Sequence, residues 1–300
     1  MLTFSELCRA FLAHSQPKAS HRRYQQIVSQ HFSQWDDFPT FGQIEEWHQA
    51  HHASPHQSNK ALSVLKAMCT WGMRRGHFAG PNPATGVKRH QVHSRERVMT
   101  SVEIALILNC LDMLYPKFAA VLTCLLTTGC RIGELLQMKV EHVNMESGSW
   151  LQPKTKNGKP HTTYLPMQAR ERLIRLNVTG LYYFEGLYGR PLSRTQVDKS
   201  WQKARGSMRL DDVRIHDFRR TLATHLYKAT KDEYLVKRCI NHVNPNITAV
   251  YVRYGSEEVR EALQGQADRF FALAPTVPHT MDLPLFPPKP MEAEGRTWLQ

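Results

Sequence analysis

Several side chains in this sequence have the chemistry that transfer of a phosphoryl group requires. Such a reaction needs a nucleophilic hydroxyl, cations that hold the non-bridging oxygens of the transition state, and an acid for the leaving oxygen. The segment IHDFRRTLATH, residues 215–225, carries His216 and Arg219 three residues apart, a spacing that puts both on one face of a helix. A guanidinium matches two phosphate oxygens and an imidazole can move a proton, although such a pair on its own is more often a surface or structural feature.

A second cation lies in the segment TTGCRIGELLQM, residues 127–138. Arg131 stands between two glycines at the predicted start of an apolar helix, where free backbone N–H groups favour an anion. The structural alternative is an arginine that pairs with Glu134 at the helix start. Glu134 could also do both, orienting the guanidinium while it serves the fold.

A third segment, RCINHVNPNITAVY over residues 238–251, supplies a hydroxyl. His242 precedes Tyr251 by nine residues, and Pro245 predicts the start of a new helix between them. A tyrosine in a helix is usually a core or rim residue, so this spacing is informative only in combination with the other segments. We take Tyr251 as the candidate nucleophile and Tyr254 as the fallback.

The segment from Val140 to Pro166 predicts a short antiparallel sheet. Asn157-Gly158 stands between two β-prone runs, and this dipeptide suits a hairpin turn because both turn positions need positive φ. Lys156 immediately precedes the turn, from which its ammonium could protonate a leaving 5′ oxygen. Lys154 and Lys159 share the loop, and each of the three lysines remains a candidate general acid.

The rest of the chain predicts the elements that position these side chains. Apolar residues recur at helical spacing over residues 1–85, which indicates a domain of about four helices, the last ending near Gly76. The polar, basic residues 86–99 predict a linker.

A second domain is expected over residues 100–274. It opens at Thr100, whose capping box Glu103 completes, and helices are predicted over 101–113 and 116–128 and up to about Met138. Loops are expected at 180–190 and 205–212, and the six prolines of residues 275–300 predict an extended tail. The predicted fold class is therefore mainly α with a small antiparallel β-sheet (α+β).

The charge of the chain favours a polyanionic partner. Thirty-nine Lys and Arg residues against 26 Asp and Glu give a formal charge of +13. The excess is +6 over residues 1–98, +8 over 99–274 and −1 over 275–300, which suggests that both domains touch a phosphate backbone. On charge alone, a merely soluble basic protein is the alternative.

The six cysteines and the 16 histidines point to no cofactor. The cysteines form no CxxC pair and mostly sit beside apolar residues, as reduced core thiols of a cytoplasmic protein do. The cluster His48, His51, His52 and His56 lacks a recognisable ligand spacing, so we expect no metal. Neither a signal peptide nor a membrane-spanning apolar run is recognisable, so we expect no membrane association.

Together these segments resemble the tyrosine recombinase (phage integrase) family. The resemblance covers the second domain, and residues 1–85 look like the family's helical core-type DNA-binding domain. The family's common Leu-Gly-His is Ile240-Asn241-His242 here. Matched to the family pattern, Arg131 is the first arginine, Lys156 the hairpin lysine and Tyr251 the nucleophile. His216 and Arg219 match the family's His-x-x-Arg motif, and His242 matches its later histidine. These six are the expected catalytic residues.

The resemblance implies a site-specific recombinase that cleaves and rejoins double-stranded DNA through a 3′-phosphotyrosine. Energy kept in the protein–DNA link makes a nucleotide cofactor unnecessary, and fixed cations replace a metal ion. The family's reaction implies a tetramer on DNA at specific recombination sites, in some cases with DNA-bending accessory proteins. A type IB topoisomerase is the alternative enzyme, and a catalytically silent DNA-binding regulator is the alternative without catalysis.

Two further expectations come from the resemblance. In relatives a C-terminal segment often packs onto the next protomer, and residues 257–274 with the tail are the segment that could do so here. The helical pattern starts within the first residues, so we expect no additional N-terminal arm-binding domain.

Overall fold

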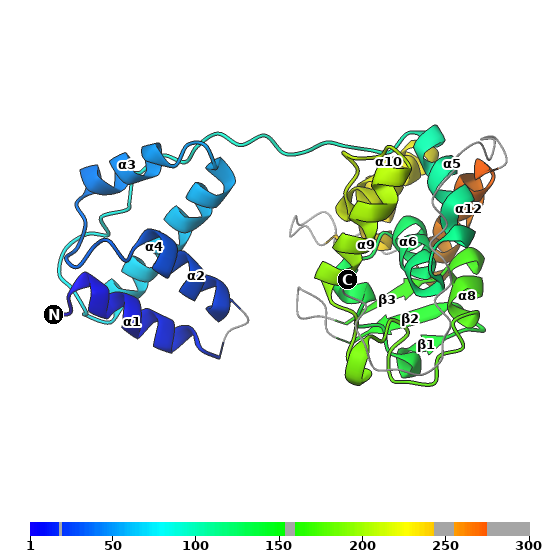
Figure 1. Ribbon diagram of the computed structural model, residues 1–300, viewed down its shortest axis with the longest axis horizontal. Helices are drawn as coiled ribbons and strands as arrows, with labels where there is room; N and C mark the ends of the chain where they lie inside the picture. The colour runs from blue at the N-terminus through cyan, green and yellow to red at the C-terminus, as the bar shows by residue number, and fades with distance from the viewer. Residues whose placement is uncertain (18–19, 154–159, 243–254, 275–300) are drawn as a thin grey trace. The chain divides into compact units, whose positions relative to one another are not determined.

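The computed structural model describes residues 1–17, 20–153, 160–242 and 255–274. The chain divides into two compact units, Met1–Arg95 and Glu96–Gln300, each with its own hydrophobic core (Figure 1). Helices dominate both units and the sheet has three strands, so the predicted fold class is confirmed. Among the described helices, none combines the length and the apolar character needed to cross a bilayer.

The first unit contains the four helices that the periodicity predicts. Two of them begin with capping boxes, formed by Thr3 with Glu6 and by Thr40 with Gln43, which satisfy backbone N–H groups at the helix start. The last helix ends as predicted, since Gly76 has a φ of +68° two residues after Arg74. The helices are α1 (Phe4–Ser15), α2 (His21–His31), α3 (Phe41–Ala50) and α4 (Pro55–Arg74).

The segment that follows α4 is partly tied to this unit. Asn59 on α4 donates to the carbonyl oxygen of His90 at 2.8 Å and accepts from the His90 N–H at 2.9 Å. The His90 ring also stacks on buried His48, with ring centroids 3.9 Å apart. The first residues of the predicted linker are therefore fixed, although they form neither helix nor strand.

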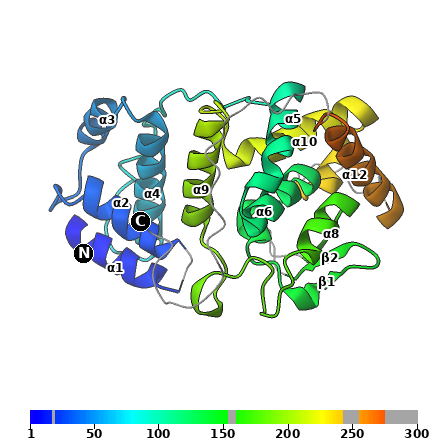
Figure 2. The same cartoon turned by 45° about the vertical axis from the view of Figure 1, so that its right-hand side comes forward.

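The second unit is built around one central helix, α6. Every residue of α6 from Ala119 to Thr128 is buried, because α8, α10 and α12 pack around it (Figure 2). The α-helices are α5 (Ser101–Cys110), α6 (Pro116–Thr128), α7 (Ile132–Leu135), α8 (Met167–Ile174), α9 (Arg194–Ser207), α10 (Ile215–Thr230), α11 (Glu233–Cys239) and α12 (Ser256–Phe271), and the 3₁₀ turns are η1 (Leu111–Met113), η2 (Val140–His142) and η3 (Leu187–Gly189).

The entry to this unit is fixed by local and distant contacts. The predicted capping box is present at α5, where Thr100 and Glu103 bond reciprocally. Arg97 forms ion pairs with both Glu103 and Asp212. These contacts hold the start of the unit against the loop that precedes α10.

The predicted hairpin forms the core of the sheet. Strand β2 (Ser149–Gln152) pairs antiparallel with β3 (His161–Tyr164) and with the short β1 (Val143–Asn144), in the order β1-β2-β3. Gln152 lies opposite His161 at the end of the ladder. The turn at Asn157-Gly158, with Lys154, Lys156 and Lys159, lies outside the described residues.

Two predicted boundaries differ from the structure. Helix α7 ends at Leu135 and does not continue to Met138, because the Met138 carbonyl oxygen accepts from the Tyr183 N–H at 3.0 Å and Lys139 forms a β-bridge with Tyr182. The loop expected from residue 205 starts later, since α9 continues to Ser207. In both cases a boundary inferred from local pattern moved by two or three residues.

Helix α12 packs on its own unit. Val259, Leu263 and Phe270 are buried in the core of the second unit, and the side chain of Gln264 accepts from the Met167 N–H at 2.8 Å. The expectation that residues 257–274 pack onto a neighbouring protomer remains a prediction, since these contacts lie within one chain. The tail, residues 275–300, lies outside the described residues.

Candidate active site

Arg131 lies at the start of α7, just after the turn that ends α6. Gly129 has a φ of +61° and turns the chain out of α6. The Arg131 guanidinium donates to Oε1 of Glu134 at 3.0 Å, and Oε2 of the same carboxylate accepts from the Arg131 backbone N–H at 3.2 Å. The predicted pairing with Glu134 is therefore present, and it holds the guanidinium in place.

Arg219 is the fifth residue of α10 and is only 7% exposed. Its Nη1 donates to the carbonyl oxygen of Gly129 at 2.7 Å. Burial, followed by the charge of Arg131, lowers the pKa of Arg219 to about 10, so the group remains charged at neutral pH. No carboxylate among the described residues forms an ion pair with it, which leaves a buried cation ready for an anion.

Asn241 and His242 bring a third segment to the same place. The carbonyl oxygen of Asn241 accepts from Nη2 of Arg131 at 3.4 Å. The backbone N–H of His242 donates to the carbonyl oxygen of Lys237 at 2.9 Å. Partial burial, then the charges of Arg219 and Arg131, lower the pKa of His242. The imidazole of His242 is thus within electrostatic range of both arginines.

His216 lies in the first turn of α10, three residues before Arg219. Its side chain is exposed, and its pKa is lowered by partial desolvation, then by the charges of Arg220 and Arg219. The structure thus gathers Arg131, Arg219 and His242 and sets His216 at their edge. The other two predicted residues, Lys156 and Tyr251, lie outside the described residues, as does Tyr254.

Two residues that the sequence did not single out join this group. His161 at the start of β3 is 9% exposed, and its Nδ1 lies 3.1 Å from Nη1 of Arg238 on α11. Burial, then the charges of Arg238, Arg131 and Arg219, lower the pKa of His161 to about 4. Strand alternation, which puts His161 on the same face as buried Thr163, is the signal that could have identified it.

The comparison with protein families agrees with this arrangement. The model of the phage integrase family matches residues 97–258, just over half of the chain. The chain belongs to the phage integrase family. The matched range contains all the residues gathered above, and it also contains the segment that carries Lys156 and Tyr251.

Two similar proteins show how far the similarity extends. The chain is 26% identical to the integrase of Escherichia phage P2 over 210 residues, which are 70% of this chain and 58% of that protein. It is also 26% identical to the tyrosine recombinase XerC of Yersinia pestis over 215 residues, or 66% of this chain and 69% of that protein. The chain thus spans less than two thirds of the phage P2 protein.

Solved integrase structures share the fold. A lambda integrase tetramer bound to a Holliday junction matches with a TM-score of 0.66 at 13% identity, covering 85% of this chain and 81% of that one. The Tn1549 transposon integrase in complex with transposon right end DNA matches with a TM-score of 0.65 at 17% identity, covering 88% of this chain and 99% of that one. At these identities the likeness concerns the fold.

The backbone conformation explains how asparagine can stand at the glycine position of the Leu-Gly-His motif. Asn241 has a φ of +52°, a region that glycine enters freely and that asparagine tolerates better than most residues. Asparagine can therefore replace the glycine without moving the carbonyl oxygen that Arg131 contacts.

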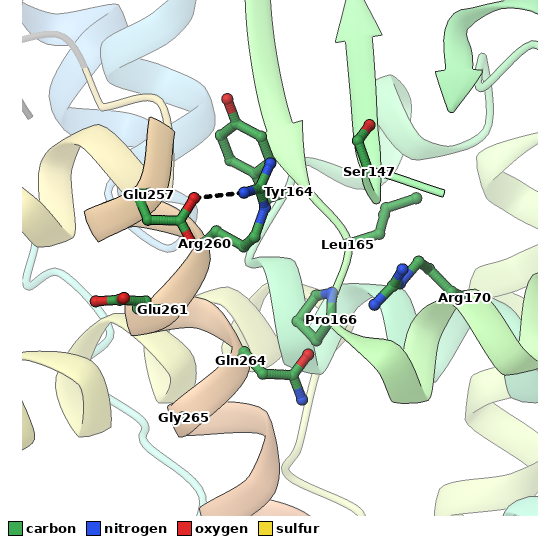
Figure 3. A pocket seen from close by; sticks show the side chains of 10 residues that line it. All are labelled: Ser147, Tyr164, Leu165, Pro166, Arg170, Glu257, Arg260, Glu261, Gln264 and Gly265. Carbon is green, nitrogen blue, oxygen red and sulfur yellow. Dashed lines mark hydrogen bonds and ion pairs between the residues drawn. The ribbon is translucent and has the colours of Figure 1, made fainter. Parts of the chain in front are cut away.

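A cavity of about 410 Å³ lies elsewhere in the unit, between the end of β3 and α12 (Figure 3). The guanidinium of Arg260, which lines this cavity, already has two partners. It forms an ion pair with Glu257 and lies 4.9 Å from the ring centroid of Tyr164. None of the predicted site residues that the structure describes lines this cavity. Within the described ranges, no group of three or more His, Cys, Asp or Glu side chains is arranged to hold a metal ion.

Proposed function

We propose that this protein is a site-specific DNA recombinase that breaks and rejoins strands through a 3′-phosphotyrosine at Tyr251. The observation that carries the proposal is that buried Arg219 donates to the carbonyl oxygen of Gly129, two residues before Arg131, while Arg131 donates to the carbonyl oxygen of Asn241, next to His242. Arg131 is also close enough to act electrostatically on Arg219, and two neighbouring planar cations suit the non-bridging oxygens of a phosphodiester. Membership of the phage integrase family supports the same chemistry.

The proposed reaction balances without a cofactor. The phenolic oxygen of Tyr251 attacks phosphorus, the P–O5′ bond breaks, and the leaving oxygen takes a proton from Lys156 to become a 5′-hydroxyl. Attack by a 5′-hydroxyl of the partner strand then reverses these steps and releases the tyrosine. Arg131 and Arg219 stabilise the charge on the non-bridging oxygens throughout.

His216 and His242 have protonation states that suit proton transfer. Their lowered pKa values keep both imidazoles mostly neutral at pH 7, so each ring can donate one hydrogen bond and accept one proton. We assign to them hydrogen bonding to the phosphate and uptake of the phenolic proton. Lys154 and Lys159 remain alternatives to Lys156.

The two units have different roles in this proposal. Residues 1–85 serve as the core-type DNA-binding domain and residues 100–274 as the catalytic domain, with the basic residues 86–99 between them. The positive charge of both parts supports contact with the DNA backbone from each. Exchange between two DNA sites calls for four active subunits, so we propose a tetramer on double-stranded DNA.

The test is covalent trapping on DNA that flanks the gene. The substrates are duplexes that cover that DNA and carry a nick near each tested position. After cleavage the short strand that bears the 5′-hydroxyl diffuses away, so the covalent protein–DNA complex accumulates and survives SDS. We expect a covalent complex in EDTA with the wild-type protein and none with Tyr251→Phe. Binding without any covalent species supports a silent regulator, and relaxation of supercoils without recombinants from paired sites supports a type IB topoisomerase.

A further inference from the structure

Among the described residues, His161 finds a hydrogen-bond partner on one side of its ring only. Its Nδ1 lies 3.1 Å from Nη1 of Arg238. A guanidinium only donates hydrogen bonds, so Nδ1 is the acceptor and carries no proton. The proton of the neutral ring is therefore on Nε2.

That Nε2–H is buried, and it has no hydrogen-bond partner in the part of the chain that the structure describes. A buried donor without an acceptor is unfavourable and uncommon in native proteins. The side chain is more than nine-tenths buried, so bulk water does not satisfy it. An acceptor that arrives with a ligand accounts for the arrangement.

The surroundings of His161 specify an anion as that ligand. Arg131, Arg219 and Arg238 all act electrostatically on the imidazole. Among the described residues, the carboxylate that pairs with one of these three guanidiniums is Glu134, at Arg131. An anion would balance the excess positive charge and offer oxygens that accept from a neutral N–H.

We propose that His161 binds the scissile phosphate through Nε2–H, and that Arg238 is the positioning residue that fixes the ring in this tautomer. The inference rests on the proposed function and adds a contact to it, namely a neutral donor beside the two arginines. A protonated ring would lose the bond from Arg238 and add a further positive charge next to three guanidiniums. The neutral ring avoids both penalties and still donates.

Two substitutions separate this role from a structural one. His161→Asn keeps an acceptor near the position of Nδ1 and removes the distal donor, whereas His161→Gln places an amide N–H near the position of Nε2. We expect His161→Asn to slow covalent trapping by roughly 10- to 100-fold with DNA affinity changed less than about threefold. His161→Gln should recover part of the rate. His142→Asn, a histidine outside the site, is the matched control and should react at the wild-type rate.

Two results would overturn the inference. One is a wild-type trapping rate for His161→Asn. The other is the reverse order, in which His161→Asn is active and His161→Gln is not, because only the bond from Arg238 would then matter.

A readout without chemistry separates this inference from the proposed function. In ¹⁵N-histidine spectra, the signals that disappear in His161→Asn should report an Nε2–H tautomer that shifts when the flanking duplex is added, and that shifts less with a duplex bearing a neutral methylphosphonate, a weaker acceptor, at the scissile position. A shift in a protein that never forms a covalent complex contradicts the proposed function alone. Covalent trapping without any change at His161 contradicts the inference alone.

Discussion

Arg219 donates a hydrogen bond of 2.7 Å to the carbonyl oxygen of Gly129, which lies 90 residues earlier in the chain. Gly129 stands two residues before Arg131, so this one bond sets the second arginine of the site against the first. The bond exists because Gly129 adopts a φ of +61° where α6 ends, which turns its carbonyl toward α10. The geometry of the proposed phosphate site therefore depends on a residue without a side chain.

Gly129→Ala should destabilise the second unit. A Cβ at this position would lie 2.8 Å from Cδ2 of Leu222 and 3.1 Å from Cγ2 of Ile240, in a left-handed conformation that alanine disfavours. We expect the free energy of unfolding to fall by about 1–3 kcal/mol in urea titrations. Gly133→Ala is the control, since nothing lies within 4 Å of its Cβ, and it should change the unfolding free energy by less than about 1 kcal/mol. Equal stability of the two variants would contradict the role assigned to Gly129.

Arg219→Lys should abolish most strand cleavage while the protein stays folded. Lysine keeps one positive charge but loses the planar fork that holds both Gly129 and a phosphate oxygen, so we expect covalent trapping to slow by at least about 100-fold. Arg220→Lys is the control. It changes the neighbouring arginine, which pairs with Asp217, and should slow covalent trapping less than about threefold. Trapping kinetics with a circular-dichroism check of folding measure both. Similar rates for the two variants would remove Arg219 from the site.

Substitutions at Asn241 should follow backbone conformation. With a φ of +52°, this position should accept glycine with a change in unfolding free energy below about 0.5 kcal/mol and lose about 1 kcal/mol with alanine. Asn241→Ala should also slow trapping, because the carbonyl oxygen that Arg131 contacts would shift. Thermal and urea unfolding of the two variants provide the measurement. If alanine proved as stable as asparagine, the left-handed conformation would not be the reason for this residue.

The second unit should lose stability in acid through His161. Its pKa is about 4 in the folded state against about 6.5 in an unfolded chain, so the folded state binds fewer protons between these values. The free energy of unfolding is therefore unaffected by this group above pH 6.5. It falls by on the order of 3 kcal/mol as the pH drops to 4, because protons bind to the unfolded chain more readily. His161→Asn should reduce the slope of unfolding free energy against pH in that window by about one proton. An unchanged slope would show that the imidazole is not held neutral by its surroundings.

Local features of this fold were predictable from sequence, and long-range ones were not. The capping box at Thr100 and Glu103 and the end of α4 at Gly76 depend on residues three or four apart, and both were predicted and confirmed. The predicted end of α7 was wrong because a β-bridge between Lys139 and Tyr182, which are 43 residues apart, sets where the helix stops. The residues proposed for catalysis came from motif spacing, which specifies order along the chain but not contact.

The contact between His161 and Arg238 shows the limit of that approach. The two residues are 77 positions apart and come from a strand and a helix that no local pattern connects. His161 lies on the buried face of its strand, which alternation indicates, but its partner follows only from where the fold places Arg238 of α11. A neutral histidine among three arginines is a property of the folded chain.

The residue that becomes joined to the DNA shows which tyrosine is the nucleophile. After trapping, nuclease digestion and trypsin, the adduct can be located by mass spectrometry, because cleavage after Arg238, Arg253 and Arg260 separates the two candidate tyrosines. We expect a nucleotide on peptide 239–253, in which Tyr251 is the only tyrosine. A nucleotide on peptide 254–260, which carries Tyr254, or an unmodified protein from an SDS-resistant complex, would contradict this expectation.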